Sequence, residues 1–379
     1  MTETRIPLVD LKAQYATLSD DVQAAFNRVE ERQYFIGGPE TKAFEEEYAA
    51  ACEASRCVAL SSGTSALELT LQALGVGAGD EVITVSHTFF ATVGAILRCG
   101  ATPVFVDVDP HTWTMSPEAV GQAVGAKTRA ILAVHLYGNP VDMAAIGSAA
   151  PGIPIIEDAA QAHGARYDGG PVGHAAAAAC YSFYPGKTLG AHGDAGAVTT
   201  NDEELAQRIR ELRDHGRAGG KYEHIHLGTN ARVSEIQAAV LRAKLPHLAE
   251  WVKRRQALSA IYEEALAPAG LPVQRVAASA EHGRHLFVVL HDDRDAARAA
   301  LSEAGIATGV HYPIPCHRQP VMDEQPSRTP GTLEVTDDLA SRCLSLPLYP
   351  ELDDADAARI AQLLIEASQP AGAGARSER

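Results

Sequence analysis

The sequence predicts an α/β fold with a mainly parallel sheet, followed by a smaller α+β domain. Between about residues 55 and 200, short apolar runs rich in β-branched residues alternate with stretches of helical periodicity. This alternation is typical of parallel strands that are buried on both faces and joined by helices. After about residue 270 the pattern changes to two strand-like and two helix-like segments, and a chain of 379 residues is long enough for two domains.

Individual segments support this assignment in chain order. Buried strands are predicted at residues 80–86, 102–109, 129–138 and 153–160. Helices are predicted at residues 64–75, 202–216 and 234–266. Leu67, Leu71 and Leu74 share one face of the first helix. Asn201 is the expected cap of the second helix, and Pro246 is expected to kink or break the third. The last part of the chain predicts strands at residues 284–292 and 307–313 and helices at residues 295–306 and 353–368.

These elements divide the chain into two predicted domains and a tail. Residues 1–250 form the larger domain, whose N-terminal segment could pack on the smaller one, and residues 251–368 form the smaller domain. Residues 369–379 lack any apolar period, so a disordered tail is expected there. In an α/β fold of this kind, ligand sites lie in the loops beyond the carboxyl ends of the strands.

The composition disfavours several classes of protein. The formal net charge of −16 argues against binding to nucleic acid or to an anionic membrane, because both need a basic face. The amino end predicts no signal peptide, and no apolar run approaches the roughly 20 residues needed to span a bilayer. The six cysteines form no CxxC pair and stand in apolar contexts, which predicts reduced thiols in a cytoplasmic protein.

One lysine, Lys187, stands among small, aromatic and glycine residues in SFYPGKTLGAHGDAG, residues 182–196. A phosphate-binding P-loop has the form G-x-x-x-x-G-K-[ST], which would place its first glycine at position 181. That position is Tyr181, and aromatic residues occupy the place where such a loop needs bare backbone N–H groups. The alternative is a lysine that forms a Schiff base with a carbonyl, usually that of pyridoxal phosphate.

A pyridoxal phosphate site needs an acid for the pyridine nitrogen, and Asp158 is the candidate. It ends a predicted buried strand in IPIIEDAAQAHGA, where a carboxylate could keep the ring nitrogen protonated. Gln161, one short turn further on, could donate a hydrogen bond to the phenolic oxygen of the ring. Taken alone, Glu157 and Asp158 would be interpreted as the cap of a loop or a helix.

The site also needs a phosphate cup and a flat group over the ring. Residues 61–65, Ser-Ser-Gly-Thr-Ser, directly precede an amphipathic helix, and hydroxyl groups at a helix N-terminus make an anion site. Taken alone, this cluster would be interpreted as an N-cap. Phe89 follows a predicted strand and could cover the ring, although an aromatic residue at such a position is more often part of the core.

Taken together, these segments resemble the DegT/StrS-type sugar aminotransferases, which are pyridoxal-phosphate enzymes of the aspartate-aminotransferase fold (fold type I). The resemblance extends over nearly the whole chain, with the segments in one order. It is carried by IPLVDLKAQY, YFIGGPETKAFEEEYA, SSGTSALEL, GDEVITVSHTFFAT, GATPVFVDVDP, VHLYGNPVDM, IEDAAQAHGA, SFYPGKTLGAHGDAGAVTT, GTNARVSEIQAAVL and HYPIPCHRQP.

The resemblance implies how the cofactor, pyridoxal 5′-phosphate (PLP) and its pyridoxamine form (PMP), is held and used. Lys187 would form the Schiff base, and Asp158 would pair with the pyridinium nitrogen. Gln161 would pair with the phenolic oxygen, and Phe89 would lie against the ring. Lys187 and Asp158 are therefore the predicted catalytic residues.

The resemblance also implies a phosphate site that two subunits share. Thr64, Ser65 and the backbone at Gly63 would hold the phosphate, together with the hydroxyl of Ser182. In this family an asparagine from the second subunit completes the site, and Asn230 occupies that position. A homodimer with an active site shared across its interface is therefore expected.

Some positions depart from the pattern of the family. Ser65 stands where the family often has Asp, Ala231 stands where Ser is usual, and PGK replaces the PTK of many members. These are small changes that should leave cofactor binding intact. The sugar 3-dehydratases of the family have histidine in place of the lysine, so the presence of Lys187 favours transamination.

The resemblance implies L-glutamate as the amino donor and a nucleotide-linked keto-sugar as the acceptor, in the biosynthesis of amino sugars. The segment VHYPIPCHRQP, residues 310–320, resembles the members that aminate C-3 of a dTDP- or UDP-linked 3-keto sugar. The same segment could instead be a rigid two-proline turn with buried aromatic residues. No metal is expected, because His311, Cys316 and His317 lack a second pair of ligands. The candidate substrate contacts are Tyr34, His163, Tyr184, His311, Tyr312 and His317.

Three alternatives to this function remain open. The first is amination at C-4 of the sugar, and the second is an aminotransferase of the same fold that acts on a ketocyclitol such as an inosose. The third belongs to a different class: a regulatory protein that binds PLP without turnover. The intact Lys187, Asp158 and phosphate cup disfavour the third alternative.

Overall fold

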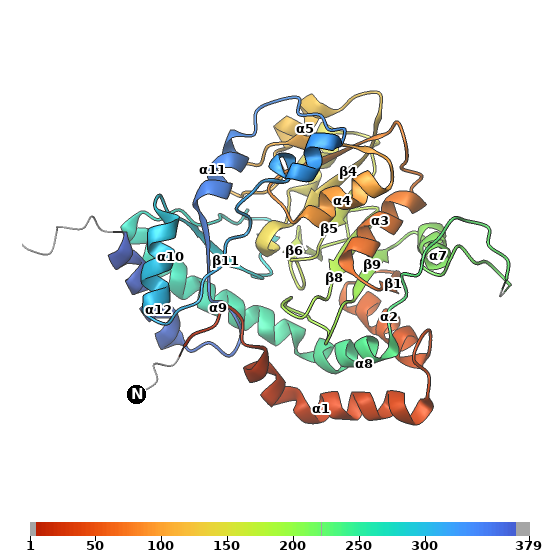
Figure 1. Cartoon of the computed structure of the whole chain (residues 1–379), viewed down its shortest axis with the longest axis horizontal. Coiled ribbons are helices and arrows are strands. Elements are labelled where there is room, and N and C mark those ends of the chain that lie inside the picture. Colours follow the sequence, from red (N-terminus) through yellow and green to blue (C-terminus); the bar gives the residue numbers. More distant parts are fainter. Residues whose placement is uncertain (1–4, 221, 369–379) are drawn as a thin grey trace, which may run out of the picture.

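The structure is a computed structural model that describes residues 5–220 and 222–368. The tail predicted at residues 369–379 lies outside the described residues. A seven-stranded sheet forms the centre of the larger part of the molecule (Figure 1). In spatial order its strands are β1 (Arg56–Leu60), β9 (Gly196–Thr200), β8 (Ala178–Ser182), β5 (Ile155–Asp158), β4 (Thr128–Val134), β2 (Glu81–Val85) and β3 (Thr102–Val106).

The sheet is mainly parallel, as predicted. The pairs β2–β3, β2–β4, β4–β5 and β5–β8 are parallel, whereas β9 runs antiparallel to both of its neighbours, β1 and β8. The four strands predicted from apolar runs correspond to β2, β3, β4 and β5. Parallel strands need helical connections, which explains why helices alternate with strands through this part of the chain.

Helices cover both faces of the sheet, because successive side chains of a strand point to opposite sides. In β4, Ala130 and Leu132 contact the core beneath one set of helices, whereas Ile131 and Ala133 contact the core on the other face. The first set is α3 (Gly63–Ala73), α4 (Phe90–Arg98) and α7 (Glu203–Leu212). The other face is covered by α1 (Leu11–Arg32), α2 (Pro39–Ala51), α5 (Pro117–Ala123), α6 (Met143–Ala149) and α8 (Glu235–Lys244).

Local hydrogen bonds decide where α7 begins, and here the sequence prediction was wrong by one residue. The side chain of Asp202, and not that of Asn201, accepts the N–H of Leu205 at 3.0 Å. The amide oxygen of Asn201 instead accepts the N–H of Ser55 at 2.8 Å, which ties the start of the helix to the loop before β1. Both side chains can cap a helix, so the long-range contact determines which of them does.

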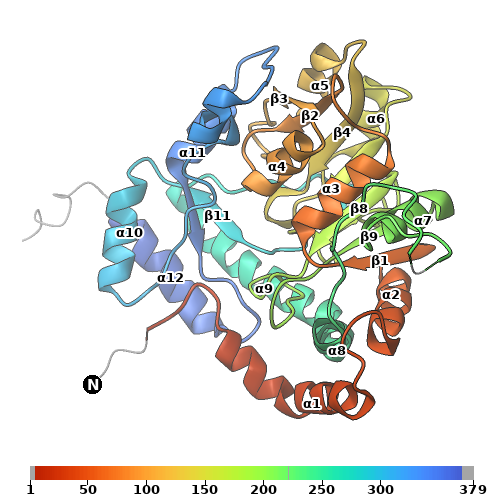
Figure 2. The same ribbon diagram turned by 45° about the vertical axis from the view of Figure 1, so that its right-hand side comes forward.

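A second apolar core surrounds a two-stranded sheet, to one side of the seven-stranded sheet (Figures 1 and 2). Ile6 belongs to this core, and its N–H donates to the carbonyl of Gly305 at 2.9 Å. The division at residue 250 falls within α9 and stays a prediction. The elements of this core are α9 (Leu248–Leu266), α10 (Arg294–Glu303), α12 (Asp354–Ala367), β11 (Phe287–Leu290) and β12 (Cys343–Leu346).

Two predictions for this region had different outcomes. Pro246 lies in the short turn η2 (Leu245–His247), which separates α8 from α9, so the predicted break is confirmed. The predicted strand at residues 307–313 was wrong, because Gly309 makes only an isolated bridge to Ser345. The segment after Gly309 turns toward the carboxyl edge of the large sheet, where His311 and Tyr312 line a cavity.

The remaining elements are short and connect these layers. No helix within residues 5–220 and 222–368 has the length and apolar character to cross a membrane. The connecting elements are β6 (Arg166–Tyr167), β7 (Gly170–Pro171), β10 (Ala280–Glu281), α11 (Glu334–Arg342), η1 (Leu136–Gly138), η3 (Ala267–Ala269), η4 (Cys316–Arg318) and η5 (Pro320–Glu324).

Candidate active site

A cavity of about 640 Å³ lies at the carboxyl ends of three neighbouring strands, where this class of fold is expected to bind ligands. Its wall contains Val134, Asp158 and Ser182, the last residues of β4, β5 and β8. The cavity gathers ten of the residues predicted from the sequence: Gly63, Thr64, Phe89, Asp158, Gln161, Ser182, Tyr184, Lys187, His311 and Tyr312.

Asp158 is buried in this wall, and Lys187, the nearby group of opposite charge, is half-buried. Burial lowers the pKa of the Lys187 amine to about 8, although the attraction of Asp158 opposes this shift. Burial also raises the pKa of Asp158, while hydrogen bonds and the charge of Lys187 act in the opposite direction. A lysine with a lowered pKa is partly neutral near physiological pH, which is the form that attacks a carbonyl.

Hydrogen bonds fix the carboxylate of Asp158 on both sides. Thr92 donates from Oγ1 to Oδ2 at 2.8 Å, and the N–H of Ala160 donates to Oδ1 at 3.2 Å. The hydroxyl of Thr88 lies 2.9 Å from that of Thr92. Because Thr92 gives its single hydrogen to Asp158, Thr88 is the donor in this second contact. The carboxylate is therefore held in one orientation at the end of β5.

The N-terminus of α3 forms one end of the cavity. Ser62 caps the helix, with its Oγ accepting the N–H of Ser65 at 3.1 Å. The hydroxyl of Ser65 lies within 3.0 Å of the hydroxyls of Ser61 and Ser62, so this side chain belongs to the cap and not to the wall of the cavity. Ser62, Gly63 and Thr64 line the cavity where the first N–H groups of the helix provide an anion site.

Two glycines allow the lysine-bearing segment to lie close to this helix N-terminus. A Cβ atom on Gly63 would lie 2.7 Å from the Cβ of Ser182, and one on Gly196 would lie 2.3 Å from the backbone carbon of Ser62. Leu60 pairs with Gly196, and Gly196 pairs with Ser182, so the three residues form one row across β1, β9 and β8. The loop that carries Lys187 runs from the end of β8 to the start of β9, so both of its ends are aligned with the start of α3.

Gln161 lines the cavity, and two hydrogen bonds determine the orientation of its side-chain amide. Its Oε1 accepts the N–H of Tyr137 at 2.6 Å, which leaves the amide nitrogen to donate to the hydroxyl of Tyr312 at 3.1 Å. The Tyr137 hydroxyl donates to the carbonyl of His311, and the ring of Phe89 lies 5.9 Å from the ring of Tyr312. These contacts position the segment of His311 and Tyr312 over the carboxyl edge of the sheet.

Two of the predicted substrate contacts do not line the cavity. His163 is buried between Tyr48 and the backbone of Ser182, with Nδ1 3.0 Å from the tyrosine hydroxyl and Nε2 2.9 Å from the carbonyl oxygen. Since a carbonyl only accepts, Nε2 carries the hydrogen, and burial lowers the pKa of His163 to about 4. The Nδ1 of His317 lies 2.7 Å from Ser86 Oγ, and His317 is not among the residues that line the cavity.

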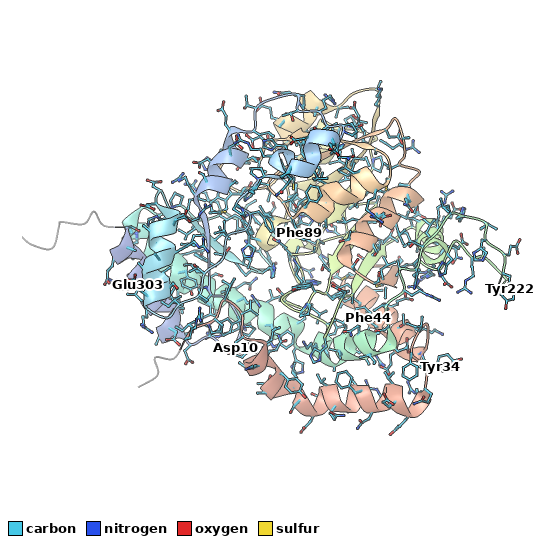
Figure 3. The ribbon with its side chains drawn as sticks, in the orientation of Figure 1. Asp10, Tyr34, Phe44, Phe89, Tyr222 and Glu303 are labelled. Atoms are coloured by element: carbon cyan, nitrogen blue, oxygen red, sulfur yellow. The ribbon has the colours of Figure 1, made fainter. Side chains whose placement is uncertain are left out.

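Tyr34 and Asn230 lie outside the cavity of their own chain. Tyr34 is exposed just after the end of α1, whereas Phe89 lies near the middle of the molecule (Figure 3). Asn230 is exposed, and its side-chain oxygen accepts a hydrogen bond from Arg232 at 3.2 Å. The contacts predicted for Tyr34 and Asn230 stay predictions, and that of Asn230 is expected with a second subunit.

The structure adds cavity residues that the sequence did not identify. Leu8 and Val9 bring the amino-terminal segment to the wall, Asp194 follows the lysine loop, and His285 enters from the segment before β11. Thr92 acts through Asp158. Of these residues, His285 lies outside every segment that carried the resemblance, and no pattern in its neighbours points to a site. Among the residues that the structure describes, no group of three or more His, Cys, Asp or Glu side chains could hold a metal ion.

The sequence is similar to one known protein family over most of its length and to several named proteins. Residues 16–365 match the DegT/DnrJ/EryC1/StrS aminotransferase family. A dTDP-3-amino-3,4,6-trideoxy-alpha-D-glucose transaminase from Streptomyces venezuelae is 46% identical over 362 residues, which cover 94% of each chain. A UDP-N-acetyl-3-dehydro-alpha-D-glucosamine 3-aminotransferase from Acidithiobacillus ferrooxidans is 42% identical and covers 95% of this chain and 97% of its own. The erythromycin biosynthesis sensory transduction protein EryC1 of Saccharopolyspora erythraea is 47% identical, with 92% and 95% covered.

Solved structures show the same fold. Streptomyces venezuelae DesV in complex with a ketimine intermediate has a TM-score of 0.93 at 44% identity, covering 97% of this chain and 99% of its own. NtdA from Bacillus subtilis with bound cofactor PMP has a TM-score of 0.85 at 30% identity, covering 95% and 83%. These similarities confirm the resemblance found in the sequence. This chain belongs to the DegT/DnrJ/EryC1/StrS aminotransferase family.

Proposed function

We propose that this protein is a PLP-dependent aminotransferase that transfers the amino group of L-glutamate to C-3 of a dTDP- or UDP-linked keto-sugar. The observation that carries the proposal is the single cavity in which Lys187 and Asp158 lie beside the N-terminus of α3. The relatives named above support the choice of substrate, because two of them are named as enzymes for 3-amino sugars linked to dTDP or UDP.

The residues of the cavity fit the cofactor. The cradle between Gly63 and Ser182 is so close that a Cβ atom on Gly63 would collide, which leaves backbone N–H groups open to a phosphate. Thr64 and Ser182 would add hydroxyl groups, Asp158 would face the ring nitrogen, and Lys187 would hold the aldehyde carbon. When bound, PLP supplies an aldehyde that takes up amino groups and a ring that withdraws electrons from the neighbouring carbon.

The chain supplies the proton transfers and the electrostatics. The Nζ of Lys187, partly neutral because its pKa is lowered to about 8, would be the base that removes the α-proton of the donor and delivers it to the cofactor carbon that carried the aldehyde. Asp158 would keep a proton on the ring nitrogen, because a buried carboxylate strongly stabilises a cation beside it. Gln161 donates from Nε2, an orientation that its bond to the N–H of Tyr137 imposes.

We infer that the working unit is a homodimer in which Asn230 completes the phosphate site of the other subunit. Asn230 is exposed and stands outside the cavity of its own chain. Exposed apolar side chains at Tyr34, Phe35 and Ile36 are consistent with a subunit contact, since such clusters mark association sites. The cytoplasmic location predicted from the cysteine pattern remains a prediction.

Absorbance of the reconstituted protein tests the function directly. The PLP form should be yellow, should bleach on addition of L-glutamate, and should recover its colour when a 3-keto dTDP- or UDP-sugar is added to the PMP form. A 4-keto sugar nucleotide and an inosose serve as comparison acceptors. If no amino donor changes the absorbance, the aminotransferase proposal is wrong, and a regulatory protein without turnover would explain the retained cofactor.

A further inference from the structure

His285 is a cavity residue that the mechanism above does not use. It lies two residues before β11, and its backbone is held on both sides: its N–H donates to the carbonyl of Tyr137 at 3.0 Å, and its carbonyl accepts from Arg255 Nη1 at 3.1 Å. Arg255 is buried and also donates to the carbonyl of Leu348 at 2.7 Å. The imidazole is therefore carried by a fixed piece of backbone at the cavity wall.

The side chain of His285 has an unsatisfied nitrogen. It is 8% exposed, and Nδ1 is buried without a hydrogen-bond partner among residues 5–220 and 222–368. Burial lowers the pKa of His285 well below its ordinary value, and the nearby Lys187 and Arg255 act in the same direction, so the free ring is neutral. Because Nδ1 has no acceptor within reach, the hydrogen of the neutral ring is expected on Nε2. His285 thus offers the cavity an N–H donor.

A second imidazole reaches the same cavity. The Nδ1 of His311 lies 2.8 Å from Ser345 Oγ, which fixes its ring, and His311 is close enough to His285 to influence its pKa. No arginine is among the described residues that line the cavity. Besides Lys187 and Gln161, the side chains of the wall that carry nitrogen are these two histidines.

The position of the two histidines relative to the sheet indicates what they bind. The strands β8, β5 and β4 lie side by side, so the wall runs from Ser182 past Asp158 to Val134. The phosphate cup lies at the β8 end. His285 lies at the β4 end, beside the residues that follow Val134, because its N–H bonds to Tyr137. Strands are about 4.8 Å apart, which separates the two ends by about 10 Å.

We propose that His285, together with His311, binds the α-carboxylate of the amino donor at the β4 end of the cavity. The proposal rests on the aminotransferase function proposed above. The amine of the donor must reach the carbon that Lys187 would hold, so its α-carboxylate lies within a few ångströms of Lys187. The cofactor's phosphate occupies the N-terminus of α3, and a carboxylate needs N–H donors. His285 supplies such a donor at the other end, and His311 lies in the same part of the wall.

The test compares variants that keep or remove the donor at Nε2. His285→Gln places an amide nitrogen near the position of Nε2, His285→Asn places it near Nδ1, and His285→Leu removes it. His282→Gln is the matched control. His282 lies on the same segment and is buried, but it does not line the cavity, and its ring nitrogens bond to Gln274 and to the N–H of Arg284. Melting curves establish that each holoenzyme is folded.

Two ligands separate binding of the α-carboxylate from other effects. The α-methyl analogue of L-glutamate cannot lose an α-proton, so its dissociation constant is read from the absorbance shift without turnover. The α-carboxamide of glutamate lacks the anionic group. His285→Leu and His285→Asn should raise the dissociation constant of the α-methyl analogue at least about tenfold and that of the carboxamide less than threefold. The reason is that only the α-methyl analogue has the anionic carboxylate, so only its binding loses a charge-assisted hydrogen bond. His285→Gln and His282→Gln should stay within threefold of the wild type.

The outcomes distinguish this inference from the function on which it rests. If the wild type bleaches with L-glutamate but His285→Leu and His285→Asn bind the α-methyl analogue normally, the carboxylate site is wrong and the aminotransferase function stands. The inference also fails if both ligands weaken equally, or if only the KM of the nucleotide-sugar rises, since His285 would then serve the acceptor. If the wild type itself never bleaches, the function fails first.

Discussion

Replacing Thr92 by valine is the sharpest test of how Asp158 is held. The Oγ1 of Thr92 donates to Asp158 Oδ2 at 2.8 Å, and both side chains are buried. Valine has nearly the same shape, so the change removes the hydrogen bond with little loss of packing. A hydrogen bond to a charged group contributes about 1.5–3 kcal/mol. Since 1.4 kcal/mol is a factor of ten, the affinity for PLP and the rate with L-glutamate should fall by roughly 10- to 100-fold.

The assay has two parts and a matched control. The apo protein is titrated with PLP by absorbance, and the bleaching rate with saturating L-glutamate is measured in a single turnover across pH. Loss of the donor raises the pKa of Asp158 further. As the pH is lowered, the carboxylate of the valine variant should therefore become protonated earlier, and its rate should begin to fall at a higher pH than that of the wild type. Thr92→Ser keeps the hydroxyl and should remain within about threefold of the wild type. Equal affinities and rates for the serine and valine variants would refute the reasoning.

Three other perturbations probe the same cavity. Capture of PLP by the apo protein should accelerate as pH rises through about 8, because the neutral amine of Lys187 is the reactive form; a flat stopped-flow profile between pH 7 and pH 9 would contradict this. Asp158→Asn should slow bleaching by L-glutamate about a hundredfold or more while leaving the melting curve intact, and a wild-type rate would remove Asp158 from catalysis. Gly63→Ala should lower the free energy of unfolding by about 1–3 kcal/mol, because its Cβ would collide with Ser182. Gly147→Ala is the control, since its Cβ meets open space and should not lower this free energy. If the two variants had equal denaturation midpoints, the space between Gly63 and Ser182 would not be as tight as described.

The sequence predicted those parts of the fold and site that depend on local pattern. The strands β2 to β5 appear as apolar β-branched runs because both of their faces are buried. Asp158 stands out because it ends such a run, and the serine and threonine cluster stands out because it precedes a helix of clear periodicity. Sites at the carboxyl ends of parallel strands are therefore marked by their position in the sequence.

The parts that were missed or wrong depend on contacts between distant segments. His285 reaches the cavity because Arg255 and Tyr137 hold its backbone, and neither contact leaves a trace in the neighbouring residues. Asn201 and Asp202 are both good helix caps, and a loop contact decides between them. The apolar segment before His311 resembles a strand, but it pairs at one point and then leaves the sheet.

The row that joins Leu60, Gly196 and Ser182 ties cofactor uptake to correct assembly of the chain. If β9 slipped by one residue against its neighbours, it would move about 3.4 Å and turn its side chains to the opposite faces. The loop that carries Lys187, between β8 and β9, would then be displaced from the start of α3, where the proposed phosphate site lies. Misaligned molecules would remain colourless. The share of a refolded sample that takes up the cofactor and turns yellow should therefore equal the share of molecules whose strands are in register.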